Sequence, residues 1–473
     1  MKLNSLSLAV AAALSASAGA TFALPVADYQ LVAGDTAELF ISGATAQENG
    51  LRNTLARICT VGTLDIYQFS NQQAGFCTIN KTVVTGTPAA VTKMVVYKSG
   101  VGGSGNGVQP VANASALTFI SMAALKATPA LVTGPTTAVA AVAATAPDTI
   151  GVPAFNRITV NTSATQSVAP EAGFSDVEPR LLGATTAENA RLTVTAPNVL
   201  IFGVPVTTAA RNALQTAQGL ISGDESEAQM PSLRKNLIAS VYTGNITNWS
   251  QLGATLTDDV IYLATRVETS GTQRSFNAYI TGSACSAGLQ AILPGTGVAA
   301  DCTAASPLQT VVAGSGSGDV TACLVGHQAN SRGAFGVLSM EFVPGTSGYR
   351  WIKIDGASPS LTNVVNGDYN FWVEPTFQYR NATTASPLAG VKKTIADRIV
   401  LQLGTEAVIT SLDNAFVQTW GRSGLLAKPS PSNLPNAIVP PTTAAAVLLN
   451  PTNAWSKSPN GAPNNCQVPV LFN

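Results

Sequence analysis

Residues 266–273 read RVETSGTQ, and this stretch decides the fold. It follows the apolar run 260–264 and precedes a helical pattern over 273–280, which gives the order strand, short loop, helix. The backbone N–H groups of residues 270–272 would then lie at a helix N-terminus, where they lack partners within the helix. Helix N-termini favour anions, and Arg266 adds a forked cation suited to an oxyanion. The stretch therefore predicts an anion-binding loop.

Other segments repeat the alternation of strand and helix. Thr45 and Glu48 fit a capping box for a helix that runs towards residue 58. Strands are predicted at 39–42, 94–97, 198–205 and 333–338, and a further helix at 235–242. Strands alternating with helices predict an α/β fold with mainly parallel sheets.

Composition indicates an exported chain with either two domains or one elaborated domain. Its 473 residues exceed one ordinary domain, and 25 Lys and Arg balance 25 Asp and Glu. Nucleic acid is not expected as a partner, because binding it requires a basic surface. Residues 1–23 resemble a signal peptide: Lys2 precedes the apolar core 6–14, and small residues follow at possible cleavage sites.

The six cysteines of an exported chain favour disulfides. Six allow 15 pairings, and the sequence cannot choose among them. The local expectation is Cys59–Cys77, Cys285–Cys302 and Cys323–Cys466. No metal and no cofactor are expected, since C-x-x-C is absent and His327 is the only histidine. His327 lies in a polar stretch and is predicted at the surface.

The glycine-rich loop 100–107 reads GVGGSGNG and matches a dinucleotide fingerprint by letter. That site also needs an acidic residue about 20 positions later, and none occurs between Gly105 and Asp148. Two alternatives remain: a flexible turn, or a loop whose N–H groups and Ser104 hydroxyl face an anion.

An enzyme is not expected. A Ser-His-Asp triad would need His327, and no serine lies in a G-x-S-x-G elbow. Paired carboxylates for glycoside hydrolysis stay open, because spatial pairs are invisible in a sequence. Hydrolysis of phosphate esters ranks last, since no nucleophile arrangement is present.

Taken together and in order, six blocks of the sequence resemble the periplasmic phosphate-binding protein of the phosphate ABC transporter. They are residues 41–45 (ISGAT), 100–107, 174–176 (FSD), 238–249 (IASVYTGNITNW), 266–272 and 333–337 (GAFGV). The resemblance implies a two-lobed type II periplasmic binding protein fold with a hinge. Lobe I is expected at 24–195 plus 335–473, with an insertion of uncertain structure at about 111–172, and lobe II at 196–334.

The resemblance also implies a ligand, inorganic hydrogen phosphate, held between the lobes. Its ligand residues carry over as Thr45, Ala46, Ser104, Asp176, Arg266, Ser270, Gly271 and Thr272, with Glu268 orienting Arg266. Asp176 would accept a hydrogen bond from the O–H of hydrogen phosphate. It would repel sulfate, which carries no O–H at neutral pH.

The expected protein is a periplasmic or secreted monomer that supplies an ABC permease. The alternative is a secreted binding or surface scaffold protein with the same fold and another anionic ligand.

Overall fold

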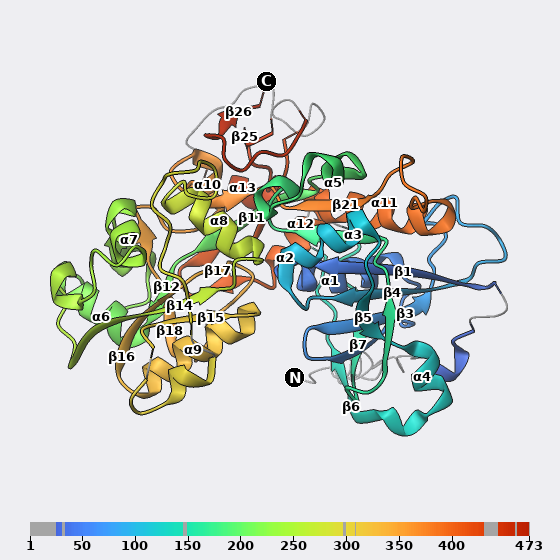
Figure 1. Ribbon diagram of the computed structural model, residues 1–473, viewed down its shortest axis with the longest axis horizontal. Coiled ribbons are helices and arrows are strands. Elements are labelled where there is room, and N and C mark those ends of the chain that lie inside the picture. The colour runs from blue at the N-terminus through green and yellow to red at the C-terminus, as the bar shows by residue number, and fades with distance from the viewer. Residues whose placement is uncertain are drawn as a thin grey trace, which may run out of the picture.

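The computed structural model describes residues 25–30, 34–144, 149–296, 299–307, 309–429, 443–458 and 461–472. The predicted signal peptide 1–23 lies outside these residues. The described chain forms two halves, each built on its own sheet (Figure 1).

Lobe I is built on a nine-stranded sheet of order β10-β21-β9-β1-β4-β3-β2-β7-β6. Its strands are β1 (Thr36–Gly43), β2 (Asp65–Phe69), β3 (Gln72–Thr78), β4 (Lys93–Ser99), β6 (Val132–Val139), β7 (Phe155–Val160), β9 (Ala172–Ser175), β10 (Leu192–Thr195) and β21 (Thr376–Arg380). The neighbours β9, β1 and β4 are parallel, so their carboxyl ends meet at one edge of the sheet.

Both faces of the central part of this sheet are covered, which explains the nearly continuous burial of β1, β3, β4 and β9. Along β1, Leu39 and Ile41 join a core with α1 (Glu48–Ile58) and α11 (Gly390–Gly404). Phe40 faces the other way and stacks on Tyr97, with ring centroids 4.4 Å apart. That second core includes β5 (Leu117–Ile120) and α4 (Met122–Ala127). Because successive side chains of a strand point to opposite faces of the sheet, β1 contributes residues to both cores.

Lobe II is built on a five-stranded sheet of order β15-β14-β16-β12-β18. Its strands are β12 (Pro205–Thr207), β14 (Asp258–Arg266), β15 (Val311–Gly314), β16 (Arg332–Gly336) and β18 (Tyr349–Trp351). Its helices are α6 (Thr208–Ala217), α7 (Lys235–Tyr242), α8 (Gly271–Ile280) and α9 (Ser317–Ala329). Because β18 pairs with β12, this lobe extends past the predicted boundary at residue 334.

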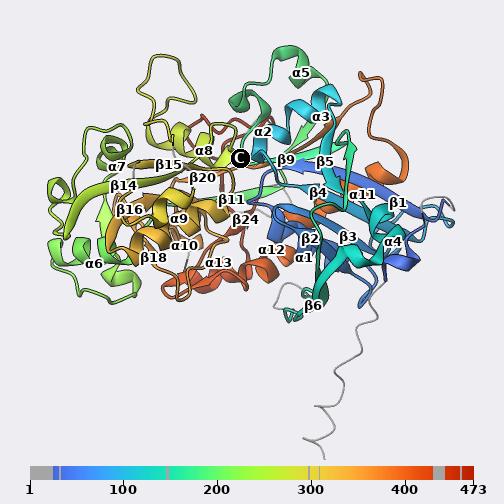
Figure 2. The same ribbon diagram turned by 60° about the horizontal axis from the view of Figure 1, so that its bottom comes forward.

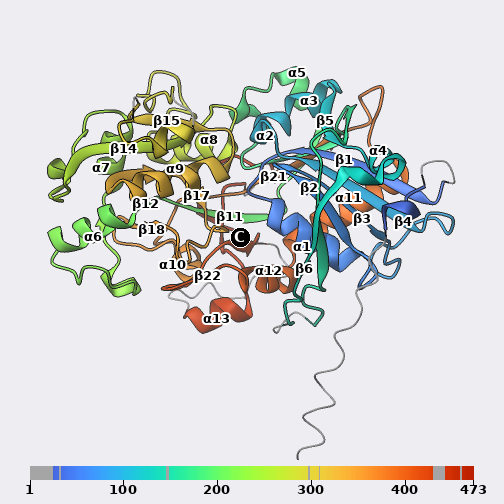
Figure 3. The ribbon, with the colours of Figure 1, turned by 90° about the horizontal axis from the view of Figure 1, so that it is seen from below.

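A separate small sheet lies where the chain passes between the halves. Its central strand β11 (Asn198–Gly203) pairs with β17 (Leu338–Ser339), β20 (Trp372–Val373) and β24 (Leu425–Ala427). Figures 2 and 3 show β11 between the two lobes. The predicted two-lobed α/β fold, in which the chain crosses more than once between lobes, is confirmed. The prediction of mainly parallel sheets is wrong, because both main sheets are mixed: β1–β4 and β14–β15 are parallel, whereas β3–β4 and β12–β16 are antiparallel.

The described residues of region 111–172, predicted to be an insertion of uncertain structure, belong to lobe I. They contribute β5, α4, β6, β7 and β8 (Thr165–Val168). β7 pairs in parallel with β2, and β6 continues the sheet at its edge. This region therefore extends the lobe I sheet.

The remaining elements are short. They are α2 (Gly103–Asn106), α3 (Gln109–Asn113), α5 (Thr186–Ala190), α10 (Leu361–Asn366), α12 (Glu406–Asp413), α13 (Ala444–Leu449), β13 (Ser232–Leu233), β19 (Lys353–Ile354), β22 (Val417–Gln418), β23 (Gly421–Arg422), β25 (Trp455–Ser456), β26 (Val470–Leu471) and the 3₁₀ turns η1 (Val26–Asp28), η2 (Pro129–Leu131), η3 (Pro179–Leu182), η4 (Glu227–Gln229), η5 (Trp249–Leu252) and η6 (Ala299–Thr303).

Of the predicted disulfides, Cys59–Cys77 is confirmed and the other two are wrong. The structure pairs Cys302 with Cys323, and it pairs Cys285 with Cys466. The turn η6, which carries Cys302, packs against α9, which carries Cys323, and the C-terminal segment returns to lobe II. Separation along the sequence alone could not identify these partners, because the packing of η6 against α9 and the path of the C-terminal segment bring them together.

Two local predictions are also corrected. His327 is buried, 1% exposed, and stacks on Tyr262 with ring centroids 4.6 Å apart, so it is not a surface residue. The predicted capping box of α1 is absent: the helix starts at Glu48, and its cap residue Gln47 makes no side-chain capping bond.

Candidate functional site

The loop between β14 and α8 is fixed by its own side chains. Ser270 caps α8 and accepts from the Gln273 backbone N–H at 3.4 Å. The Gln273 side chain turns back instead to accept from the Arg266 backbone N–H at 2.8 Å. The helix therefore begins at Gly271, slightly earlier than predicted, and its N-terminal N–H groups face out of lobe II.

Lobe I presents Ser104 and Asp176 at the carboxyl edge of its sheet. Ser104 lies in α2, and its Oγ accepts from the Asp176 backbone N–H at 3.1 Å. Gly43, with φ +107°, has no room for a side chain, since a Cβ there would lie 2.0 Å from the Phe174 oxygen. Glycine at this position lets the loops after β1, β4 and β9 meet.

The two lobes contact each other at these loops. Thr272 Oγ1 donates to Asp176 Oδ2 at 2.9 Å, and Gly105 N–H donates to the Thr269 oxygen at 2.9 Å. A methyl group added at Gly271 would lie 2.3 Å from Ser104 Oγ. The structure is therefore closed at the candidate site.

Arg266 is a buried cation on the lobe II side of this contact. Its guanidinium donates to the Gly314 oxygen at 3.2 Å, to the Ser315 oxygen at 3.0 Å and to Ser317 Oγ at 2.9 Å. Burial lowers its pKa to about 10, opposed by Asp176 among other acidic groups, so it is charged at neutral pH. Two of its five N–H bonds have no partner among the described residues and stay available to a ligand.

Glu268 does not orient Arg266, and that prediction is corrected. Its side chain is 62% exposed and pairs with Arg274 at 3.2 Å. The group that organises the Arg266 acceptors is Asp319, whose carboxylate accepts from Ser315 Oγ at 2.8 Å. The role implied by the resemblance does not hold here, because β14 directs Arg266 inward while Glu268 in the following loop is exposed.

The loop that holds the Arg266 guanidinium was not predicted from the sequence. Residues 314–317 read GSGS and lead directly into α9, with Asp319 in its first turn. The Asp319 carboxylate also accepts from the Gly316 backbone N–H at 2.9 Å. A glycine- and serine-rich loop between a strand and a helix, like the one after β4, was the available signal.

Asp176 is 2% exposed and carries an unusual combination of contacts. Burial raises its pKa, while the Thr272 hydroxyl, Arg266 and Lys98 act to lower it. Its Oδ1 has no hydrogen-bond partner among the described residues. An acceptor oxygen is thus presented beside a buried cation, an arrangement suited to an anion that carries a proton.

Thr45 and Ala46 lie between β1 and α1, on the same edge of the sheet. The neighbouring Ala44 N–H donates to the Phe174 oxygen at 2.9 Å, which ties this loop to the strand that leads to Asp176. A Cβ at Gly100 would lie 2.9 Å from the Thr45 side chain, so the glycine-rich loop packs directly against it. Of the predicted site residues, Ser104 and Asp176 of lobe I therefore meet Gly271 and Thr272 of lobe II directly, while Thr45 lies against the glycine-rich loop on the lobe I side.

One group of metal-ligating side chains occurs in the described part of the chain, formed by Cys302, Cys323 and His327. The two cysteines form a disulfide with each other, so their sulfurs are not available as thiolate ligands. Among the described helices, none combines the length and the apolar character needed to cross a membrane.

The chain is 22% identical over 192 residues to the phosphate-binding protein PstS of Bacillus subtilis (strain 168). The match covers 41% of this chain and 53% of the relative, so the chain spans about half the length of that curated protein. No family model matches the chain. The resemblance predicted from the sequence blocks, similarity to a phosphate-binding protein, is confirmed.

Solved structures give further matches of low similarity. A phosphate ABC transporter substrate-binding protein with bound phosphate from Clostridium perfringens is 15% identical, with a TM-score of 0.44 and coverage of 80% of this chain and 97% of that one. An ABC-type phosphate transport receptor from Vibrio cholerae is also 15% identical, with a TM-score of 0.39 and the same coverage.

Proposed function

We propose that this chain is an exported binding protein that closes its two lobes over inorganic hydrogen phosphate. The observation that carries the proposal is the pair of buried opposite charges at the lobe contact. Arg266 on lobe II is 3% exposed, and Asp176 on lobe I presents the unpartnered Oδ1. Such a pair suits a ligand that is anionic and also carries a hydroxyl hydrogen.

The chemistry follows from which atoms donate and which accept. Backbone N–H groups of the loops and the N-terminus of α8 would donate to the phosphate oxygens, and Arg266 would offset part of the charge. The ligand O–H would donate to the Asp176 carboxylate. Sulfate at neutral pH has no O–H, so it would face a buried carboxylate without a hydrogen bond, which is costly.

The proposed ligand set follows the sequence prediction without Glu268. It comprises Thr45, Ala46, Ser104, Asp176, Arg266, Ser270, Gly271 and Thr272. The similarity to the Bacillus phosphate-binding protein supports the ligand. We further take the chain to be a periplasmic or secreted monomer that delivers phosphate to an ABC permease without turnover.

Calorimetric titration of the ligand-stripped mature protein with phosphate and then sulfate tests the proposal. We expect tight binding of phosphate alone. Arg266→Ala should weaken binding at least about 100-fold, because it removes charge-assisted hydrogen bonds of about 1.5–3 kcal/mol each. The matched control is Arg274→Ala in α8, whose partner Glu268 is exposed. Absence of a phosphate response in folded wild-type protein would reject the proposal.

A further inference from the structure

Lys98 is a buried cation behind the site that the proposed ligand set does not include. It lies near the carboxyl end of β4 and is 1% exposed. Its Nζ donates to the Gly43 oxygen at 2.8 Å and to the Ser99 oxygen at 3.3 Å. Within the described ranges it forms no ion pair. Because a buried charge without an ionic partner is costly, such a position requires an explanation.

The charged neighbours of Lys98 belong to the site or lie beside it. Burial lowers its pKa to about 8, Glu48 and Asp176 act to raise it, and Arg52 acts to lower it. In turn, Lys98 and Arg266 are the two cations that oppose the effect of burial on Asp176. The geometry agrees with this coupling: β4, which carries Lys98, and β9, which leads to Asp176, both flank β1, and Lys98 Nζ donates to the Gly43 oxygen at the β1 residue that pairs with Phe174. Lys98 therefore lies behind the one carboxylate that would accept a hydrogen bond from the ligand O–H.

Glu341 is the other carboxyl group that faces Asp176. Burial, with Asp176 and Glu48 nearby, raises the pKa of Glu341 well above its ordinary value. A raised pKa favours the neutral form of Glu341, so the charges that oppose the effect of burial on Asp176 are those of Lys98 and Arg266.

We propose that Lys98 is a specificity-determining positioning residue, which keeps Asp176 ionised and so makes the site select a protonated oxyanion over a fully deprotonated one. The inference rests on the proposed phosphate-binding function. With Lys98 charged, Asp176 accepts the O–H of hydrogen phosphate. Without that charge, Asp176 holds a proton of its own and donates, and sulfate, which only accepts, becomes a suitable ligand.

Lys98→Gln tests this, because glutamine keeps a donor for the Gly43 carbonyl and removes only the charge. We expect the ratio of sulfate to phosphate dissociation constants to fall about tenfold at pH 6, since a nearby opposite charge shifts a carboxyl pKa by about 1–3 units. The ratio should recover towards pH 8, where Asp176 ionises without help. Lys93→Gln is the matched control, since Lys93 lies at the other end of β4 and pairs with Asp35.

An unchanged ratio at both pH values would overturn the inference, as would an equal loss for both anions that is independent of pH. If Lys98→Gln does not fold, the wild-type pH series replaces it: selectivity must fall as pH decreases, and Asp176→Asn must abolish that dependence. Failure of wild-type protein to bind phosphate would reject the proposed function instead, before any variant is compared.

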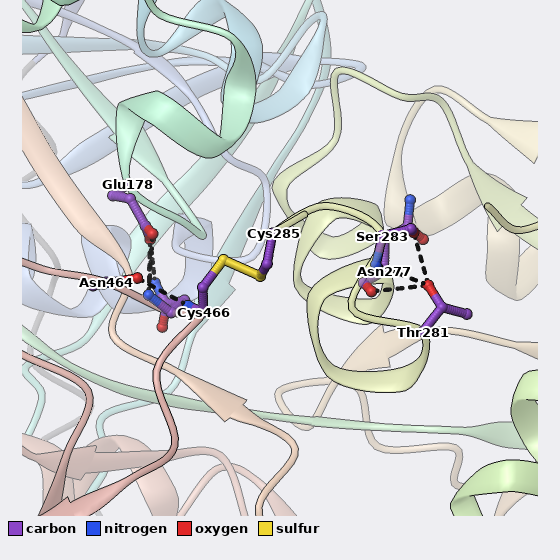
Figure 4. Close-up of a disulfide and its surroundings, with 8 residues drawn as sticks. Glu178, Asn277, Thr281, Ser283, Cys285, Asn464 and Cys466 are labelled. Carbon is purple, nitrogen blue, oxygen red and sulfur yellow. Dashed lines mark hydrogen bonds between the residues drawn. A yellow bond between two sulfur atoms is a disulfide. The ribbon is translucent and has the colours of Figure 1, made fainter. Parts of the chain in front are cut away.

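The C-terminal segment supplies an independent observation, because it ties the two lobes together (Figure 4). Cys466 forms the disulfide with Cys285, which follows α8 in lobe II. The preceding residue, Asn465, donates from its backbone and its side chain to the Glu178 carboxylate of lobe I, at 3.1 and 2.8 Å. Its Oδ1 also accepts from the Glu374 backbone N–H at 2.9 Å.

This strap, residues 464–466, joins the elements that close the site. Glu178 follows Asp176 closely in the chain, and the α8 that precedes Cys285 begins at Gly271. Asn465 is 5% exposed, so its bonds to lobe I are not weakened by solvent. Figure 1 shows the C-terminal segment, in red, above the junction of the lobes.

We infer that the strap holds the lobes in the closed arrangement, so that the Cys285–Cys466 disulfide controls the rate of ligand release. The inference again rests on the proposed function. A covalent bond on one lobe and buried hydrogen bonds on the other restrict the separation that release requires, which disfavours the open state.

Stopped-flow measurement of phosphate release tests this with the double variant Cys285→Ser/Cys466→Ser. We expect release at least about tenfold faster, because affinity changes within one system occur mostly in dissociation rates. Small-angle scattering should show a larger ligand-free radius. Asn465→Ala, with the disulfide intact, should give an intermediate rate.

The matched control is Cys59→Ser/Cys77→Ser, which removes a disulfide confined to lobe I. Release rates within about twofold of wild type for the Cys285/Cys466 variant, with an unchanged radius, would overturn the inference. Wild-type binding, measured first, reports on the proposed function separately.

Discussion

Substitution of Gly271 by alanine should prevent closure without unfolding either lobe. The added Cβ would lie 2.3 Å from Ser104 Oγ, 2.9 Å from Ser104 Cβ and 2.8 Å from Asp176 Cβ. Non-bonded contacts of this kind need about 3.5 Å, so the lobes must separate by about 1 Å. Alanine is a good helix former at the start of α8, so local stability should not suffer.

The separation translates into a loss of affinity. The Thr272–Asp176 hydrogen bond of 2.9 Å would lengthen by a similar amount and be lost, together with ligand bonds that span the lobes. Each charge-assisted bond contributes about 1.5–3 kcal/mol, so phosphate affinity should fall about 10- to 100-fold per bond lost. Calorimetric titration with phosphate measures this directly.

The control is Gly318→Ala in α9, where a Cβ meets nothing within 4 Å. A double-mutant cycle of Gly271→Ala with Ser104→Gly sharpens the test, because Ser104→Gly removes two of the three clashing atoms. We expect the combined loss to be smaller than the sum of the single losses. If Gly271→Ala binds phosphate within twofold of wild type, the contact between Gly271 and Ser104 is not part of the ligand-bound arrangement.

Three further outcomes follow from the structure. Glu268→Ala should change phosphate affinity less than twofold, since the exposed Glu268 side chain pairs with Arg274, and a tenfold loss would restore its predicted role. Burial lowers the pKa of His327 from 6.5 to about 4, so His327 is neutral in the folded protein at neutral pH. Its contribution to the free energy of unfolding is therefore complete above pH 6.5 and is lost as pH falls towards 4, by up to about 3 kcal/mol. Urea unfolding measures this loss, and His327→Gln should flatten the pH dependence. Cys59→Ser/Cys77→Ser should lower the free energy of unfolding by about 3 kcal/mol, because the disulfide closes a short loop; a change below 1 kcal/mol would show that lobe I does not depend on it.

The local elements that carry the site could be predicted from the sequence. The run from strand to loop to helix at residues 260–280 appears as β14 and α8, and the strand at 94–97 lies within β4. Hydrophobic periodicity and the turn residues fix such elements within a short window, so no distant contact is needed to recognise them.

Distant pairings could not be predicted. The choice of Cys466 as the partner of Cys285, with a sequence separation of 181, depends on the path of the C-terminal segment across the lobes. The incorporation of region 111–172 into the lobe I sheet likewise depends on the pairing of β7 with β2. Neither pairing leaves a local signal, because strand pairing over long separations is decided by the packing of the whole sheet.

The sequence by itself determined which residues could form an anion-binding loop: Arg266 with the Ser, Gly and Thr that follow it at a helix start. Only the tertiary structure decided how that loop is used. It turned Arg266 onto loop 314–317 and directed Glu268 to solvent, and it placed Asp176 of the other lobe against Thr272. The physical reason is that backbone N–H groups and helix ends are local properties, whereas the burial and pairing of charges depend on groups that the fold brings together from distant parts of the chain.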